Sequence, residues 1–128
     1  MRIIGIGVDI VDNKRIKKSI KNKKFIARIF SKNEINLSKK FIDKINYFSK
    51  RFAAKESLSK ALGTGFAKGL NFKDISIVND KYGKPHYELS SKVKKIVYSK
   101  YKVKKANFYL SLSDEKKYSI AFTLISTN

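Results

Sequence analysis

Residues 41–62 carry the longest helical pattern in this 128-residue chain, and this pattern constrains the fold more than any other segment. Apolar side chains recur at helical spacing along it, namely Ile42, Ile45, Phe48, Phe52 and Ala53. Gly63 follows the last helical residue and is a typical helix stop. Gly63-Thr64-Gly65 could also contact phosphate, although a lone Gly-x-Gly is a weak signal. The pattern predicts one long central helix with the other elements packed around it.

The second half of this helix places charged side chains among small apolar ones. Glu56 is accompanied by Lys55 and Lys60, and the surrounding residues are Ala53, Ala54, Leu58, Ala61 and Leu62. One interpretation is a surface ion pair between Glu56 and Lys60, which at this spacing would be worth about 0.2–0.5 kcal/mol. Small residues, however, also let another chain or a ligand approach closely. We therefore expect Glu56 to be partly enclosed and to belong to a site.

A second carboxylate, Asp9, interrupts an apolar run near the N-terminus. Residues 2–11 are rich in β-branched side chains and predict a buried strand. An ionised carboxylate there is costly unless it is paired or binds a metal. Asp9 could simply cap a turn or pair with a lysine. Alternatively, Asp9 and Glu56 would hold Mg²⁺ together with water and phosphate oxygens, and nearby lysines would neutralise charge on the phosphate.

The remaining segments alternate between helical and extended patterns. Helices are expected at 13–21 and 24–30, from the capping box Ser31-Lys32-Asn33-Glu34 onwards, and at 90–102. Strands are expected at 72–78, 86–89, 107–113 and 118–125. No linker or repeat divides residues 1–128, so we expect one domain. The predicted fold class is α+β, with a mostly antiparallel sheet and helices packed on it.

The formal net charge of +20 suggests an acidic partner. A basic nucleic-acid-binding module is one interpretation, but it leaves Asp9 and Glu56 without a role. Only four of the 30 basic residues are arginine, and Ile and Asn are also frequent, as AT-rich codon usage would produce. Lysines of residues 14–24 surround Ile16 and Ile20 and form a basic face. This face would suit an acidic helical partner.

The chain contains no cysteine, which excludes a disulfide framework, a thiolate nucleophile and a thiolate zinc site. The apolar run near the N-terminus is too short and too polar for a signal peptide, and no run approaches transmembrane length. We therefore expect a cytoplasmic protein that does not enter membranes.

Several segments, taken in order along the chain, resemble the holo-[acyl-carrier-protein] synthase family, the small single-domain type of 4′-phosphopantetheinyl transferase. The matching segments are Gly5–Val11, Arg15-Ile16, Arg51–Glu56, Lys60–Gly65, Gly69–Phe72, Asn79-Asp80, Gly83–Pro85 and Leu110–Glu115, with Tyr118 and Ala121. Each segment alone is a weak indication. Together they cover most of the chain and are specific.

The resemblance implies a reaction and a set of site residues. Members of this family transfer the 4′-phosphopantetheine arm of coenzyme A to a serine of apo acyl carrier protein, with Mg²⁺, in fatty acid biosynthesis. Asp9 and Glu56 would be the metal-binding acids, Lys60 the cation on the phosphate, and Glu56, or a metal-bound water that it orients, the base. The residues near the nucleotide end of coenzyme A would be Arg51, Lys84, Pro85, Ser111 and Ser113. Those that contact the carrier would be Arg15, Lys24 and Arg28.

The family also implies an assembly, because its members are typically homotrimers with active sites between subunits. One position departs from the family pattern. Many members carry His after the triplet that corresponds to residues 111–113, whereas this chain has Asp114. We therefore assign no ligand role to Asp114 and leave the rest of the implied site unchanged.

Overall fold

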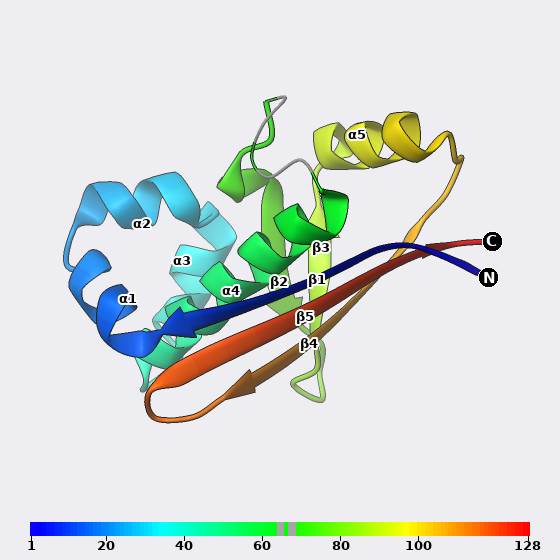
Figure 1. The fold of residues 1–128 in the computed structure, drawn as a ribbon. Helices are drawn as coiled ribbons and strands as arrows, with labels where there is room; N and C mark the ends of the chain where they lie inside the picture. Colours follow the sequence, from blue (N-terminus) through cyan, green and yellow to red (C-terminus); the bar gives the residue numbers. More distant parts are fainter. Residues whose placement is uncertain (64–65, 67–68) are drawn as a thin grey trace.

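The computed structural model describes residues 1–63, 66 and 69–128, so most of the possible phosphate loop, Thr64 and Gly65, lies outside the described residues. Three strands form an antiparallel sheet in the order β1 (Arg2–Asp12), β5 (Tyr118–Thr127) and β4 (Asn107–Asp114). The two chain ends lie side by side, because β1 and β5 pair from Arg2 with Thr127 to Asp12 with Tyr118 (Figure 1). Helices lie on one side of this sheet, and the predicted α+β class is confirmed.

A smaller antiparallel sheet is formed by β2 (Ile75–Asn79) and β3 (Pro85–Leu89). It is preceded by the 3₁₀ helix η1 (Phe72–Asp74) and followed by α5 (Ser91–Tyr101). The sequence pattern predicts a strand from residue 72, and this boundary is wrong. The Asp74 carboxylate accepts a hydrogen bond from the Asn71 amide and closes a turn, so the strand begins three residues later.

The longest helix, α4 (Lys44–Leu62), lies against the inner face of the three-stranded sheet and forms the centre of the core (Figure 1). It begins three residues later than the pattern predicts, because the Asp43 side chain accepts a hydrogen bond from a first-turn amide and caps the helix there. The predicted end is confirmed, since Gly63 has a left-handed φ of 74°. None of the described helices is long and apolar enough to cross a membrane.

β1 and α4 approach each other closely because glycine occupies two positions of the strand. A Cβ atom added at Gly7 would collide with the carbonyl oxygen of Ser57, and one added at Gly5 would collide with that of Ala61. The backbone of the strand therefore rests directly on the helix. Residues two apart on a strand share a face, so Asp9 points toward the same helix.

Three short helices follow β1, namely α1 (Asn13–Ser19), α2 (Lys23–Ile29) and α3 (Lys32–Ser38). They lie together beside α4, beyond the end of β1 (Figure 1). The predicted capping box at the start of α3 is confirmed: Ser31 Oγ accepts from the Glu34 amide, and the Glu34 carboxylate accepts from the Ser31 amide. This junction fixes the direction in which the chain leaves α2.

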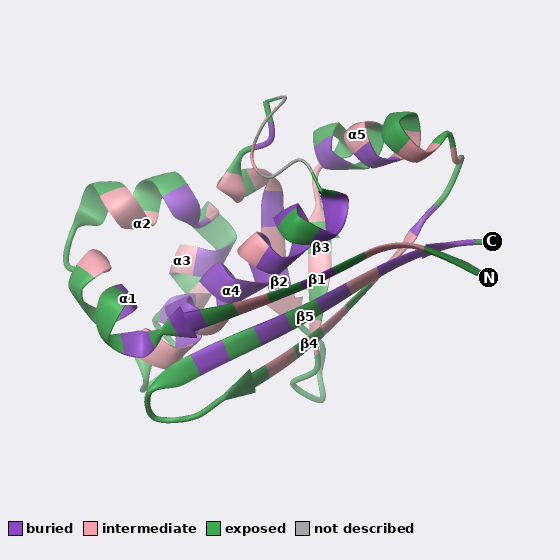
Figure 2. Ribbon diagram, viewed as in Figure 1, coloured by how far each residue is buried: buried purple, intermediate pink, exposed green. Residues whose placement is uncertain are grey.

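The outer face of the three-stranded sheet carries exposed apolar side chains. Figure 2 shows how exposed and buried positions alternate along β5. Ile6, Val8 and Ile10 of β1 are 56%, 54% and 60% exposed. Ile120 and Phe122 of β5 are also exposed. Because helices cover the sheet on one side only, the predicted burial of residues 2–11 is correct for the inner face and wrong for the outer face.

Candidate active site

Asp9 and Lys60 join the strand and the helix that carry the two predicted acids. The Lys60 Nζ atom lies 3.0 Å from Asp9 Oδ1. The Asp9 side chain is 14% exposed and that of Lys60 is 56% exposed, so the pair lies where a ligand can reach it. Among the described residues, Lys60 forms its ion pair with Asp9 and none with Glu56. Asp9 is therefore paired with a lysine, as one interpretation of the sequence allows. That lysine is Lys60, the same residue that we predict to contact phosphate.

Glu56 lies one helical turn before Lys60 and is partly enclosed, as its small neighbours predict. Burial is the main cause that raises the pKa of the Glu56 carboxyl, and the negative charge of Asp9 raises it further. The positive charges of Lys60 and Arg15 act in the opposite direction. These four side chains form one electrostatic group, which we call the acid cluster.

The two carboxylates of the acid cluster suit a divalent cation that prefers oxygen ligands. The charge of Asp9 raises the cost of ionising Glu56, and a cation between the two carboxylates would relieve this repulsion. The described residues contain no group of three or more His, Cys, Asp or Glu side chains that could hold a metal ion. Water and substrate oxygens would therefore have to complete the ligand set of such an ion.

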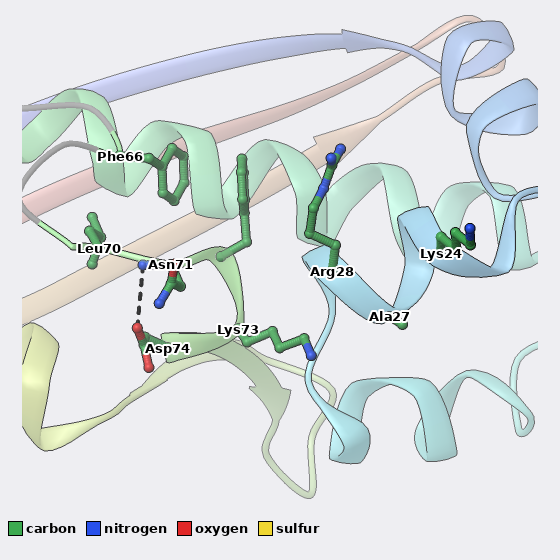
Figure 3. A pocket seen from close by; sticks show the side chains of 9 residues that line it. Lys24, Ala27, Arg28, Phe66, Leu70, Asn71, Lys73 and Asp74 are labelled. Carbon is green, nitrogen blue, oxygen red and sulfur yellow. Dashed lines mark hydrogen bonds between the residues drawn. The ribbon is translucent and has the colours of Figure 1, made fainter.

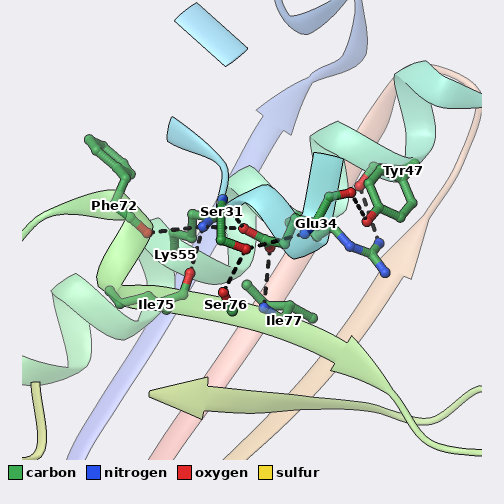
Figure 4. A network of polar contacts seen from close by, with 9 residues as sticks. Ser31, Glu34, Tyr47, Lys55, Phe72, Ile75, Ser76 and Ile77 are labelled. Atoms are coloured by element: carbon green, nitrogen blue, oxygen red, sulfur yellow. Dashed lines mark hydrogen bonds and ion pairs between the residues drawn. The ribbon is translucent and has the colours of Figure 1, made fainter. Parts of the chain in front are cut away.

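Lys55 does not belong to the acid cluster, although it precedes Glu56 in the sequence. Its side chain is fully buried, and its Nζ atom lies 2.7 Å from Glu34 Oε1 (Figure 4). Burial lowers the pKa of Lys55, and the charge of Glu34 opposes this shift. Grouping Lys55 with Lys60 is therefore wrong, because residues five positions apart on a helix point about 140° apart.

A pocket near the start of α4 contains two of the predicted nucleotide contacts. It has a volume of about 320 Å³, and its lining includes Arg51, Pro85, Asn79 and Tyr47. The buried Arg51 guanidinium lies 3.6 Å from the centroid of the Tyr47 ring and donates through Nη2 to Asn79 Oδ1 at 2.7 Å. Its Nε atom has no hydrogen-bond partner within the described part of the chain. The pocket is thus lined by a buried cation whose guanidinium group is only partly hydrogen-bonded among the described residues.

Asp114, which departs from the family pattern, lines the same pocket. Its Oδ2 atom accepts a hydrogen bond of 2.6 Å from Asn46 Nδ2, and its Oδ1 atom lies 3.6 Å from Lys50 Nζ. The Asp114 carboxylate is thus held by side chains of its own chain.

The three other predicted nucleotide contacts are exposed. Lys84 lies in the turn between β2 and β3, where its amide donates to Asp80 Oδ1 at 2.9 Å. Ser111 and Ser113 alternate with half-buried positions of β4 and point to the outer face of the sheet. The family resemblance assigns these three residues to one site. In the structure they lie on a turn and on one face of a sheet.

The pocket and the acid cluster lie on different sides of α4. Arg51 and Glu56 are five residues apart, which separates their directions by about 140° around the helix. One chain therefore brings Asp9, Glu56 and Lys60 together, and separately Arg51 and Pro85, but does not join the two groups.

The predicted carrier contacts lie on α1 and α2. Arg15 of α1 belongs to the acid cluster, and its guanidinium carbon lies 5.7 Å from the centroid of the Phe52 ring. Lys24 and Arg28 of α2 line a cleft of about 870 Å³, which we call the α2–η1 cleft (Figure 3). The other residues that line it are Ala27, Phe66, Leu70, Asn71, Phe72, Lys73 and Asp74. The cleft therefore combines cationic and apolar side chains, as a partner with acidic and apolar residues requires.

The chain belongs to the 4′-phosphopantetheinyl transferase superfamily, whose family model matches residues 5–123. Its relatives within this superfamily share the name of one particular enzyme. A holo-[acyl-carrier-protein] synthase of Pelagibacter ubique is 58% identical over 125 residues, with 98% of each chain covered. A protein of the same name from Ruthia magnifica is 42% identical over 127 residues, again with 98% of each chain covered.

Solved structures give the same result. A holo-(acyl-carrier-protein) synthase of Bacillus anthracis, in complex with CoA (3′,5′-ADP), superposes with a TM-score of 0.83 at 34% identity and full coverage of both chains. A holo-[acyl-carrier-protein] synthase of Neisseria meningitidis superposes with a TM-score of 0.85 at 34% identity, covering 98% of this chain and 99% of its own. The predicted phosphopantetheinyl transferase fold is therefore confirmed.

Proposed function

We propose that this protein acts as a holo-[acyl-carrier-protein] synthase. It transfers the 4′-phosphopantetheine arm of coenzyme A to a serine hydroxyl of apo acyl carrier protein and releases adenosine 3′,5′-bisphosphate. The observation that carries this proposal is the acid cluster, in which Asp9, Glu56 and Lys60 lie together with Arg15. It occurs in a chain 58% identical to such an enzyme. Residues 1–128 form the transferase domain. A cytoplasmic location and a place in fatty acid biosynthesis follow from these two substrates.

The residues of the acid cluster have distinct tasks in this reaction. The serine oxygen forms a bond to the phosphorus that carries the pantetheine arm, and the bond from that phosphorus to the bridging oxygen breaks. Glu56, or a water that it orients, accepts the serine proton, and a raised pKa makes its carboxylate a stronger base. Lys60 neutralises negative charge on the phosphate oxygens. The leaving nucleotide keeps the bridging oxygen.

A divalent cation fits the same residues. Asp9 and Glu56 provide the oxygen donors that Mg²⁺ prefers, and Mn²⁺ suits the same donors. When bound, Mg²⁺ would supply positive charge to the pyrophosphate of coenzyme A. The Lys60 ammonium group, whose Nζ atom lies 3.0 Å from Asp9 Oδ1, would itself attract and orient the pyrophosphate.

The predicted homotrimer with sites between subunits is part of the proposal. Support comes from the apolar outer face of the sheet, where Ile6, Val8 and Ile10 are all more than half exposed. Further support comes from the separation of the Arg51 pocket and the acid cluster within one chain. A second copy that packs on the outer face would cover the apolar residues, and its Arg51 pocket could complete the acid cluster of the first.

The carrier docks, in this proposal, on the face formed by Arg15, Lys24 and Arg28. Arg15 links this face to the acid cluster, since its charge acts on Glu56. An acidic carrier would be attracted by the net charge of +20. The nucleic-acid-binding alternative accounts for the charge as well, but it gives no role to the two carboxylates and has no support among the relatives.

Intact-protein mass spectrometry tests the proposed function directly. Apo acyl carrier protein, coenzyme A, Mg²⁺ and this protein are incubated with and without a chelator. We expect the carrier to gain the mass of one phosphopantetheine, and the gain to disappear with the chelator. No gain with several different carriers would overturn the proposal.

A further inference from the structure

The buried Lys55–Glu34 pair contacts the backbone of η1, one wall of the α2–η1 cleft, and the segment that directly follows α2, the other wall. One wall is η1, and Lys55 Nζ donates to the carbonyl oxygens of Phe72 at 2.9 Å and Ile75 at 2.5 Å. The third donor of the ammonium group meets Glu34 Oε1 at 2.7 Å (Figure 4). All three N–H groups of Lys55 are therefore satisfied, and two of them hold the backbone of the η1 wall.

Glu34 holds the segment directly after α2, the helix that forms the opposite wall. Its Oε1 atom accepts from the Ser31 amide at 3.0 Å, and Ser31 directly follows Phe30, the C-cap residue of α2. Its Oε2 atom accepts from the Ile77 amide of β2 at 3.2 Å. A hydroxyl contact of 2.8 Å between Ser76 and Ser31 joins β2, which follows η1, to the same segment. The segments that continue the α2 wall and the η1 wall are thus connected through one continuous polar network.

A fully buried ion pair adds little net stability, because removing two charges from water costs free energy that their attraction must offset. Well-packed apolar residues of similar volume are often equally stable or more stable at such positions. An ion pair, in contrast, has short and directional contacts that fix the positions of the backbone segments it joins. The arrangement of Lys55 and Glu34 therefore suits the control of a geometry better than it suits the supply of stability.

We propose that the Lys55–Glu34 pair is a positioning device that sets the width of the α2–η1 cleft and, through it, the fit of the docking segment of the carrier protein. Neither residue lines the cleft, so both act through the side chains that do, among them Arg28 and Lys73. Only the identity of the docking partner rests on the proposed function. The control of cleft width does not.

The first test measures the cleft without any reaction. The chain has no cysteine, so Ala27→Cys in the α2 wall and Lys73→Cys in the η1 wall give two unique, exposed sites for spin labels. Dipolar EPR then gives the distance distribution between the walls. We expect the double variant Lys55→Met with Glu34→Gln, which leaves the net charge unchanged, to shift or broaden this distribution.

The control is Tyr87→Phe, which damages a different buried network. The Tyr87 hydroxyl contacts the carbonyl oxygen of Ala54 and Thr123 Oγ1, each at 2.6 Å, away from the cleft. This variant should lose stability with an unchanged distance between the labels. Ser76→Ala is the alternative if the double variant fails to fold. It removes the contact between β2 and the segment after α2 without leaving a buried charge. We expect a smaller change in the label distance, in the same direction.

The second test uses steady-state kinetics of transfer. In the double variant we expect the KM for the carrier to rise roughly tenfold, with the KM for coenzyme A within about twofold of its original value, as a change confined to one docking site would produce. A purely structural role would lower the active fraction and leave both KM values unchanged. An unaltered label distance overturns the positioning role. An altered distance with an unaltered carrier KM overturns the link to the carrier.

Discussion

Lys60 of α4 holds Asp9 of β1 at 3.0 Å across 51 residues of sequence, so the longest helix and the first strand meet at the acid cluster. This contact also brings Glu56 within the electrostatic influence of Asp9. The predictions below use this arrangement and the packing that supports it.

Replacement of Asp9 by Ala should abolish most of the transfer activity while the protein stays folded. The side chain faces a partly open site, so its loss removes an oxygen donor without creating a large cavity. We expect kcat/KM to fall by roughly 10²-fold or more. The matched control is Asp12→Ala in the same strand, where the carboxylate caps α1 and should affect stability rather than transfer. Near-normal activity of the Asp9 variant would remove Asp9 from the site.

Glu56 should give the protein a characteristic dependence of stability on pH. Burial and Asp9 raise the pKa of its carboxyl above 4.5, so the folded state holds this proton more tightly than the unfolded state. Its contribution to stability is fully present below the unfolded pKa and is lost as pH rises through the raised pKa. Urea unfolding over a pH series, with chelator present, should show this loss in the original protein and not in Glu56→Gln.

The same substitution tests the role of Glu56 as a base. In the original protein, kcat should fall at acidic pH, because the Glu56 carboxylate must be ionised to accept the serine proton. Glu56→Gln should lower kcat severely and abolish this acidic limb. An unchanged pH–rate profile in the Gln variant would show that another group takes the proton.

Gly7→Ala should disrupt the contact between β1 and α4. An added Cβ atom would collide with the carbonyl oxygen of Ser57, so the strand or the helix must move. We expect a loss of about 2–4 kcal/mol in the free energy of unfolding, measured by urea denaturation at fixed protein concentration. Gly83→Ala is the control. That residue has a φ of 84° but open space around it, so backbone strain alone should cost about 1 kcal/mol. Equal losses in the two variants would contradict the close packing.

Ile10→Glu should prevent association of the chain and lower transfer activity together. Ile10 lies on the apolar outer face and is 60% exposed in one chain, so a partner that covers it would have to bury the new charge. Ile42→Glu is the matched control, since Ile42 is fully exposed and lies in the loop before α4 rather than on a strand. Light scattering after size-exclusion chromatography should show monomers for the first variant only. A trimer that persists in Ile10→Glu would exclude this face as the interface.

Much of the architecture can be predicted from the sequence because hydrophobic periodicity and helix-end residues are local. The end of α4 at Gly63 and the capping box at Ser31 are such local features, and both are confirmed. The errors at Phe41 and Phe72 also have local causes, since single carboxylates, Asp43 and Asp74, bond to nearby amides and move the boundary.

The contacts of the site residues are less predictable, because they depend on how distant segments pack. The spacing of Glu56 and Lys60 favours a pair within the helix, yet Lys60 reaches Asp9 instead. The partner of Lys55 was beyond prediction for the same reason. The sequence indicates Glu34 as a capping residue and gives no sign that the same carboxylate also receives a buried lysine from 21 residues away.

The complete burial of Lys55 has a practical consequence for chemical labelling. Reagents that acylate primary amines modify lysines at the protein surface and cannot reach an ammonium group enclosed in the core. In a chain this rich in lysine, Lys55 would remain unmodified while exposed lysines react. Its acylation, followed by peptide mapping, would therefore record how often the segments around it separate in solution.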